Sequence, residues 1–191
     1  IPLATPLYMN YLYKKERKIN TIRVRRALKE LNIIGFHPSK DYMVFSSYAT
    51  PEEWRIFIKG PKGTPFQNKW LNIFMSLPSK FPTEPPSFRF VTIPFHPNVS
   101  MEGTVVFSMI DSKYSPDIGI DAMIDGIIKL LKNPEKSSAI NIEALKIYND
   151  DKDKFKEKQK KMETGNDDFK EFLDGVKVYK DVPDDESIDE E

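Results

Sequence analysis

The spacing of the apolar residues changes between positions 92 and 120, and this change restricts the fold more than any other feature. Before it lie four short segments rich in aromatic and β-branched residues, separated by turns that contain Gly or Pro: 42–48, 54–59, 70–77 and 88–92. After it, apolar residues recur every three or four positions, as in a helix with one buried stripe: Ile120, Met123, Ile124, Ile127, Ile128 and Leu131. Consecutive strands joined by short turns favour an antiparallel meander over alternating βαβ units. The sequence therefore predicts an α+β fold.

Helices are also expected on either side of this region. One is predicted at about 20–33, with Gly35 just past its C-terminal end. The long helix should end at Asn133-Pro134, because proline cannot continue a helix. Two further helices are predicted at 141–149 and 151–163, the last of them rich in lysine and mostly solvated.

Three parts of the chain are predicted: an N-terminal extension at 1–19, a domain at 20–165 and an acidic, weakly structured tail at 166–191. The extension is expected to lack an early helix because Pro2 and Pro6 oppose one. Apolar residues in the tail, among them Phe169 and Phe172, could dock on another part of the chain. Because the sequence begins with Ile1 instead of Met, it is interpreted as a fragment or a processed product.

The composition restricts the chemistry. The 191 residues include no cysteine, which excludes a disulfide framework, thiolate metal sites and thiol catalysis, and fits an intracellular protein, cytoplasmic or nuclear. The only two histidines, His37 and His96, are far apart, so neither a metal site, a cofactor nor a serine triad is expected. No apolar run approaches the length of about 18–20 residues that a membrane-spanning helix needs.

The net charge is zero, but the charges are unevenly distributed. Residues 14–29 carry eight basic side chains against Glu16 alone, and residues 181–191 carry seven acidic ones and no basic one. Both segments are interpreted as solvated charge. No aromatic platform is interleaved with the basic segment, so nucleic-acid binding is not expected.

One motif carries a functional signal. The segment 95–107 reads His96-Pro97-Asn98, then Gly103 five residues after the Asn, then an apolar run. This resembles the active-site segment of ubiquitin-conjugating (E2) enzymes. In that family the eighth residue after the Asn is the cysteine that carries ubiquitin as a thioester, and here that residue is Val106. Valine has no lone pair and cannot act as a nucleophile.

Further landmarks stand in register with this motif. They are the helix segment 25–31, Trp54 with Gly60-Pro61, the Pro-rich segment 81–86 with Phe90, Tyr114-Ser115-Pro116 in place of Trp-Ser-Pro, Asn133-Pro134, and the segment 141–144. The resemblance covers about residues 20–165. It implies the ubiquitin-conjugating (UBC) fold: an N-terminal helix, a four-stranded antiparallel meander, a long active-site-type loop and three C-terminal helices.

The resemblance also implies roles for individual residues. Those with a partner-binding role would be Arg23, Arg25, Arg26 and Lys29, which resemble the basic face that engages the activating enzyme, together with Thr83, Tyr114, Ser115 and Pro116. Thr83 stands where many members present a large apolar residue to a RING-type ligase, which weakens the expectation of ligase recruitment. Ser138 matches the gate position near the thiol. Asn98 would stabilise an oxyanion in active members, or else hold loop backbone, and the second interpretation is favoured because no thioester can form.

The sequence therefore predicts a catalytically inactive domain and not an enzyme. It would bind ubiquitin or a ubiquitin-like protein noncovalently, or act as an adaptor or cofactor of an active conjugating enzyme or ligase, without nucleic acid, membrane or metal. It resembles the enzyme variants that lack the cysteine, but it keeps the His-Pro-Asn motif and the last helices. Two alternatives remain open: a ubiquitin-conjugating transferase whose cysteine has been altered in this sequence, and a structural interaction module with no link to ubiquitin.

Overall fold

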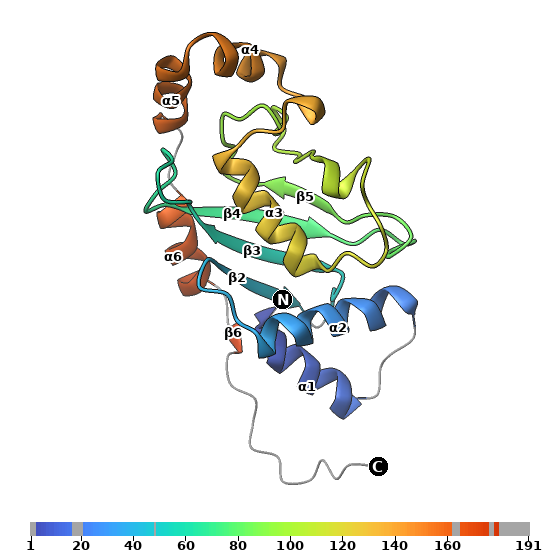
Figure 1. Ribbon diagram of the computed structural model, residues 1–191. Helices are drawn as coiled ribbons and strands as arrows, with labels where there is room; N and C mark the ends of the chain where they lie inside the picture. Colours follow the sequence, from blue (N-terminus) through green and yellow to red (C-terminus); the bar gives the residue numbers. More distant parts are fainter. Residues whose placement is uncertain (1–2, 17–20, 48, 162–164, 176–177, 180–191) are drawn as a thin grey trace.

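A six-stranded sheet in the order β5-β4-β3-β2-β1-β6 forms the centre of the computed structural model (Figure 1). The structure describes residues 3–16, 21–47, 49–161, 165–175 and 178–179. The four longer strands form the predicted antiparallel meander: β2 (Tyr42–Ser47), β3 (Glu53–Lys59), β4 (Trp70–Ser76) and β5 (Ser87–Phe90). Two-residue strands extend its edge: β1 (Leu3–Ala4) pairs antiparallel with β2, and β6 (Val178–Tyr179) pairs parallel with β1.

One face of the sheet carries the main core. Alternate residues of β3, Trp54, Ile56 and Ile58, are fully buried against the helices α2 (Ile22–Phe36) and α3 (Ile120–Lys132). The apolar stripe of α3 that the sequence predicts supplies much of this contact, because all of its residues are buried except Ile128, which is partly buried. The loop between β5 and α3 lies beside these two elements (Figure 1).

The opposite face is covered by a helix that the sequence analysis did not expect. Residues predicted to be weakly structured form α6 (Gly165–Gly175), which packs on β4. The ring of Phe169 stacks on Trp70 at 4.6 Å, and both Phe169 and Phe172 lie within 5 Å of Phe57. Phe57 alternates with the core residues of β3, so burial of its ring on the second face accounts for the docking of α6.

Two expectations about the N-terminal part are wrong. Residues Pro6–Glu16 form the helix α1, with Pro6 as its first residue. Proline is tolerated there because the N–H groups of the first helical turn have no intrahelical partner. Gly35 lies inside α2, where α1 approaches so closely that a Cβ would come within 2.7 Å of Leu7. The division of the chain into three parts, with boundaries at 1–19, 20–165 and 166–191, stays a prediction. The acidic segment 181–191 lies outside the described residues.

The remaining helices complete the chain order. Two short 3-10 helices, η1 (Ser108–Ile110) and η2 (Lys136–Ser138), flank α3, and α4 (Ile142–Asp150) and α5 (Lys152–Lys160) follow. Asn141 and Asp151 cap α4 and α5 in the usual way, each with a side-chain oxygen that accepts a backbone N–H three residues ahead. Among the described residues, no helix combines the length and apolar character needed to cross a lipid bilayer.

Candidate functional site

His96 anchors the long loop to the core. Its ring is fully buried, Nδ1 accepts the backbone N–H of Asn98 at 3.1 Å, and Nε2 lies 3.0 Å from the carbonyl of Leu130 on α3. With Nδ1 as an acceptor, Nε2 must be the protonated nitrogen that donates to Leu130. Burial lowers the pKa of His96 to about 4, against the weaker effect of the bond to Leu130. The ring is therefore neutral at physiological pH and holds the loop by two hydrogen bonds.

Asn98 connects this loop to the segment that follows α3. Its side-chain amide donates to the carbonyl of Glu135 at 2.8 Å, and its side-chain oxygen accepts the N–H of Glu135 at 2.9 Å. The backbone carbonyl of Asn98 also accepts the N–H of Val106 at 2.9 Å. The carboxylate of Glu135 in turn accepts the N–H of Ser108 at the start of η1, at 2.9 Å. Asn98, Val106, Ser108 and Glu135 thus form one connected network of backbone-directed hydrogen bonds, called here the Asn98 network.

Val106 contributes its backbone N–H to this network. It is half-buried, whereas its neighbours Val105 and Phe107 are buried. The apolar run 105–107 is therefore buried at its two ends and only partly buried at Val106. Its side chain is partly accessible because the two flanking residues direct theirs into the core. The position that carries the thiol in the family is therefore partly accessible to solvent, but it holds only hydrocarbon.

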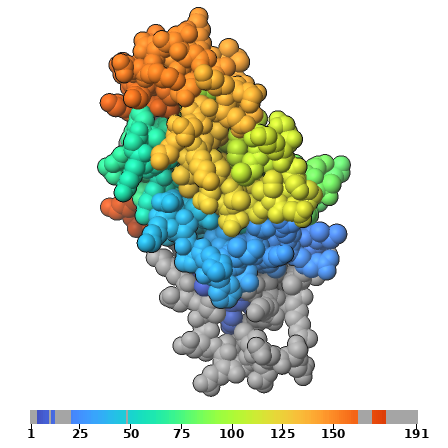
Figure 2. All heavy atoms as spheres, viewed as in Figure 1, coloured from blue at the N-terminus to red at the C-terminus, as the bar shows by residue number. Residues whose placement is uncertain are grey.

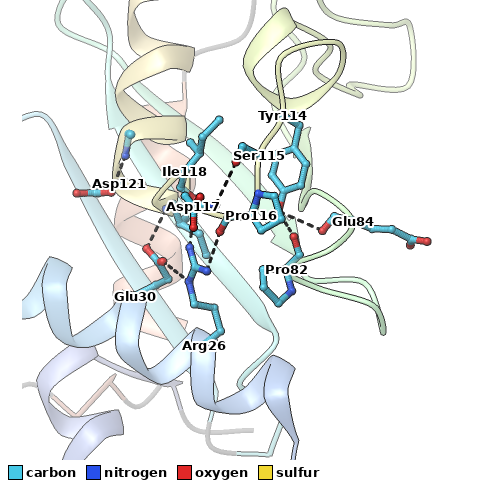
Figure 3. A network of polar contacts seen from close by, with 12 residues as sticks. Arg26, Glu30, Pro82, Glu84, Tyr114, Ser115, Pro116, Asp117, Ile118 and Asp121 are labelled. Carbon is cyan, nitrogen blue, oxygen red and sulfur yellow. Dashed lines mark hydrogen bonds and ion pairs between the residues drawn. The ribbon is translucent and has the colours of Figure 1, made fainter.

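A second polar network joins α2 to the loop before α3 (Figure 3). The side chain of Glu30 is 3% exposed and accepts Nε of Arg26 at 2.6 Å. Its other oxygen accepts the N–H of Ile120 at 2.9 Å. Because Gly119 has no side chain to cap α3, Glu30 caps that helix from a different element. Arg26 also donates to the carbonyl of Pro116 at 2.7 Å and to that of Ile118 at 3.4 Å.

Tyr114 extends this network to the Pro-rich segment. Its hydroxyl donates to the carbonyl of Pro82 at 2.6 Å and contacts that of Glu84 at 3.4 Å (Figure 3). Burial raises the pKa of the Tyr114 phenol, Arg26 acts in the opposite direction, and Glu30 adds to the increase. Tyr114 therefore keeps its proton at neutral pH and remains a hydrogen-bond donor.

The predicted partner-binding residues separate into two groups. Arg26 and Tyr114 direct their polar groups into the protein, with Ser115 half-buried and Pro116 exposed beside them. Arg25 and Lys29 are exposed on α2 one turn apart. Arg23 lies between the groups, since it pairs with Glu52 at 3.2 Å and also helps line a cleft of about 550 Å³.

That cleft also contains Thr83. It lies between the start of α2 and the Pro-rich segment, and it includes Ile22, whose side chain is 67% exposed. The predicted gate residue Ser138 ends η2 and is half-buried. It lies in the segment held by the Asn98 network, since the N–H of Ser138 donates to the carbonyl of Glu135 at 3.2 Å. The structure thus brings His96, Asn98, Val106 and Ser138 to one region, and Arg23 and Thr83 to another.

The sequence analysis missed Glu135 and Glu30. Glu135 lies 37 residues from Asn98 and has no local pattern that marks it. Glu30 carried a usable signal, because an acidic residue four positions after Arg26 forms an ion pair on a helix. Its placement among the apolar residues of the buried side of α2, between Leu28 and Leu31, could have indicated a buried pair.

The fold and the loop are those of a known class of proteins: an α+β domain whose meander, long loop and following helices present a His-Pro-Asn turn beside a nucleophile position. The family described as ubiquitin-conjugating enzyme matches residues 26–163. The chain belongs to this family, as a member without any cysteine.

Several curated fungal relatives are each named ubiquitin-conjugating enzyme E2 2. The one from Debaryomyces hansenii is 30% identical over 102 residues, which cover 53% of this chain and 61% of that protein. The one from Candida albicans is 31% identical over 98 residues, covering 51% and 55%. The one from Neurospora crassa is 31% identical over 102 residues, covering 53% and 68%. The matched part of the chain thus spans little more than half the length of the first two relatives.

Proposed function

We propose that this chain is a catalytically silent member of the family that acts by noncovalent binding, as an adaptor or cofactor of an active conjugating enzyme. The observation that carries the proposal is the hydrocarbon side chain of Val106 at the position of the thiol, in a chain without cysteine. A thioester needs a sulfur nucleophile, and valine has no atom that can attack the activated carboxyl group of ubiquitin.

The Asn98 network supports this proposal. Its hydrogen bonds join the loop, the segment after Val106 and the segment after α3 through backbone groups. Each of these bonds satisfies a polar group that is at least partly buried. A His-Pro-Asn motif therefore has a structural role in this protein that does not require a thioester intermediate.

Exposed features of the domain supply the surfaces for binding. Arg25 and Lys29 present two positive charges on α2, and among the described residues no carboxylate pairs with either. The neighbouring cleft with Arg23 and Thr83 contains the exposed side chain of Ile22, which adds an apolar contact. A ubiquitin-pathway protein that carries an acidic and apolar surface is the partner that suits this area.

The first test is a charging reaction. When the protein is incubated with the ubiquitin-activating enzyme, ATP and ubiquitin, we expect no adduct on a non-reducing gel or by intact-protein mass spectrometry. The variant Val106→Cys should form a thiol-sensitive adduct if the activating enzyme still recognises the domain. Val105→Cys is the matched control, because it places a thiol one residue away at a buried position and should remain uncharged.

An adduct on the unmodified chain would contradict the proposal. Noncovalent binding is tested separately by titrating isotope-labelled ubiquitin, and then a labelled active conjugating enzyme, with the unmodified chain. Chemical-shift changes on one of them, reduced by Arg25→Glu with Lys29→Glu, are expected. An absence of shifts with both would instead favour a structural module with no link to ubiquitin.

The second candidate function is that of an active transferase. It is favoured by the relatives, which are named as ubiquitin-conjugating enzymes. In this case the natural protein would have a cysteine at position 106, and Val106→Cys would restore ubiquitin transfer to a lysine substrate. A Val106→Cys variant that is charged but transfers no ubiquitin would favour the silent domain.

A further inference from the structure

We infer that the domain has a binding site for a small oligophosphate in a lysine-lined cleft on the side of α3 that faces the β3–β4 turn. The cleft has a volume of about 600 Å³ and lies between the turn 60–69 and the C-terminal half of α3. Figure 2 shows this turn, in teal, beside the yellow and gold atoms of α3. The volume falls within the range of small-molecule sites, about 300–1,000 Å³.

The charge of the cleft indicates an anionic ligand. Its charged lining residues are Lys59, Lys62, Lys69, Lys129, Lys132 and Asp41. Five lysines thus line the cleft against one aspartate, in a protein whose net charge is zero. A concave surface lined by one sign of charge concentrates the field, and this raises the local concentration of ligands of the opposite sign.

Among the described residues, these lysines have no ion-pair partner. Within the part of the chain that the structure describes, no carboxylate lies within 4.0 Å of any of the five ammonium groups. Lys59 rests over the ring of Trp70 at 5.4 Å. Asp125 lies one turn before Lys129 and feels its charge, but the two do not form an ion pair within 4.0 Å. A multiply charged anion would therefore meet several ammonium groups without first displacing an internal partner.

The wall formed by the turn is held rigidly. Gly60 donates its N–H to the carbonyl of Lys69 at 2.8 Å, which closes the turn. The hydroxyl of Thr64 donates to the carbonyl of Pro61 at 2.7 Å, and Phe66 is fully buried beneath the turn. Gly60 is required here, because a Cβ would come within 1.7 Å of the carbonyl oxygen of Phe66. The backbone that carries Lys62 and Lys69 is thus ordered before any ligand binds.

The wall formed by α3 is equally fixed. Ile127, Leu130 and Leu131 are buried in the core, so the exposed residues Lys129 and Lys132 project from a helix that cannot rotate. Binding would order only lysine side chains, so its entropic cost is confined to them. Because the lysines lie on both walls of the cleft, a ligand with several phosphates matches their distribution better than a ligand with a single phosphate.

The test uses tripolyphosphate as the probe, with isothermal titration calorimetry and amide chemical shifts as readouts. We expect tripolyphosphate to bind about tenfold more tightly than sulfate at the same ionic strength, with shifts confined to residues 59–70 and the second half of α3. The double variant Lys62→Gln/Lys132→Gln should weaken binding about tenfold. Both lysines are exposed, so unchanged thermal unfolding is expected to accompany this loss.

The matched control is Lys113→Gln/Lys146→Gln, which removes the same charge from two exposed lysines outside the cleft. It should change the affinity by less than about twofold. An equal loss in both double variants, or shifts spread over the whole surface, would overturn the site.

Magnesium-free ATP is titrated in parallel. Equal affinity for ATP and tripolyphosphate assigns recognition to the phosphate chain alone, tighter ATP binding identifies a nucleotide as the source, and binding of neither overturns the proposal.

Discussion

Replacing Glu30 with alanine is expected to lower the free energy of unfolding by about 3 kcal/mol or more. Glu30 is buried, and its carboxylate accepts both the guanidinium of Arg26 and the first N–H of α3 (Figure 3). Its removal leaves a largely buried guanidinium without its counter-charge and an N–H at the helix start without an acceptor. Both losses destabilise the same contact between α2 and α3, so urea-induced unfolding should show a markedly lower midpoint.

The control for this prediction is Glu84→Ala. Glu84 pairs with Lys80 at 3.2 Å, one turn apart, and both side chains are exposed. Such a pair contributes about 0.2–1 kcal/mol, so its loss should be small. The isosteric variant Glu30→Gln should lie between the two, because it keeps an acceptor oxygen but loses the charge. An equal effect of Glu30→Ala and Glu84→Ala would contradict the role of Glu30 as a cap of α3 from a different element.

Acidification is expected to destabilise the protein through His96. Burial lowers the pKa of His96 to about 4 in the folded state, below the value of 6.5 for an exposed histidine. The unfolded chain therefore binds more protons between these two values, and the stability contribution is present above pH 6.5 and is lost as the pH falls towards 4. The loss should amount to about 2 kcal/mol between pH 7 and 5, and to about 3 kcal/mol by pH 4.

The measurement is the free energy of unfolding at several pH values for the unmodified chain and for His96→Gln. The variant should be less stable at pH 7, but its stability should fall less steeply between pH 7 and 5. His37→Gln is the control, because His37 is exposed, and its pH dependence should follow the unmodified chain. Parallel curves for the chain and His96→Gln would show that the buried imidazole does not titrate as argued.

The helices and strands of the domain could largely be predicted from the sequence. The apolar spacing of α3 and the strands of the meander depend on local periodicity, and each was found within one or two residues. The helix α1 was missed because proline was counted against a helix without regard to its position as the first residue. The helix α6 was missed because its two phenylalanines pack against Trp70, Phe57 and Phe45 of the sheet, contacts that only the tertiary structure brings together.

The candidate site shows a similar division. The motif His96-Pro97-Asn98 and its distance from Val106 could be seen directly in the sequence. The partners of Asn98 could not, because Glu135 reaches it from a segment 37 residues away. In the same way, the basic appearance of α2 in the sequence did not distinguish the internally bonded Arg26 from the exposed Arg25.

By itself, the amino-acid sequence determined the family, the α+β order of elements and the chemistry that position 106 cannot perform, because these depend on residue identity and local spacing. The tertiary structure alone decided which charges point inward and which remain free. It brings Glu30 to the start of α3, Glu135 to Asn98 and five lysines to one cleft, from segments far apart in the chain. The physical reason is that the effect of a charge depends on its burial and its neighbours, and both are set by packing between elements.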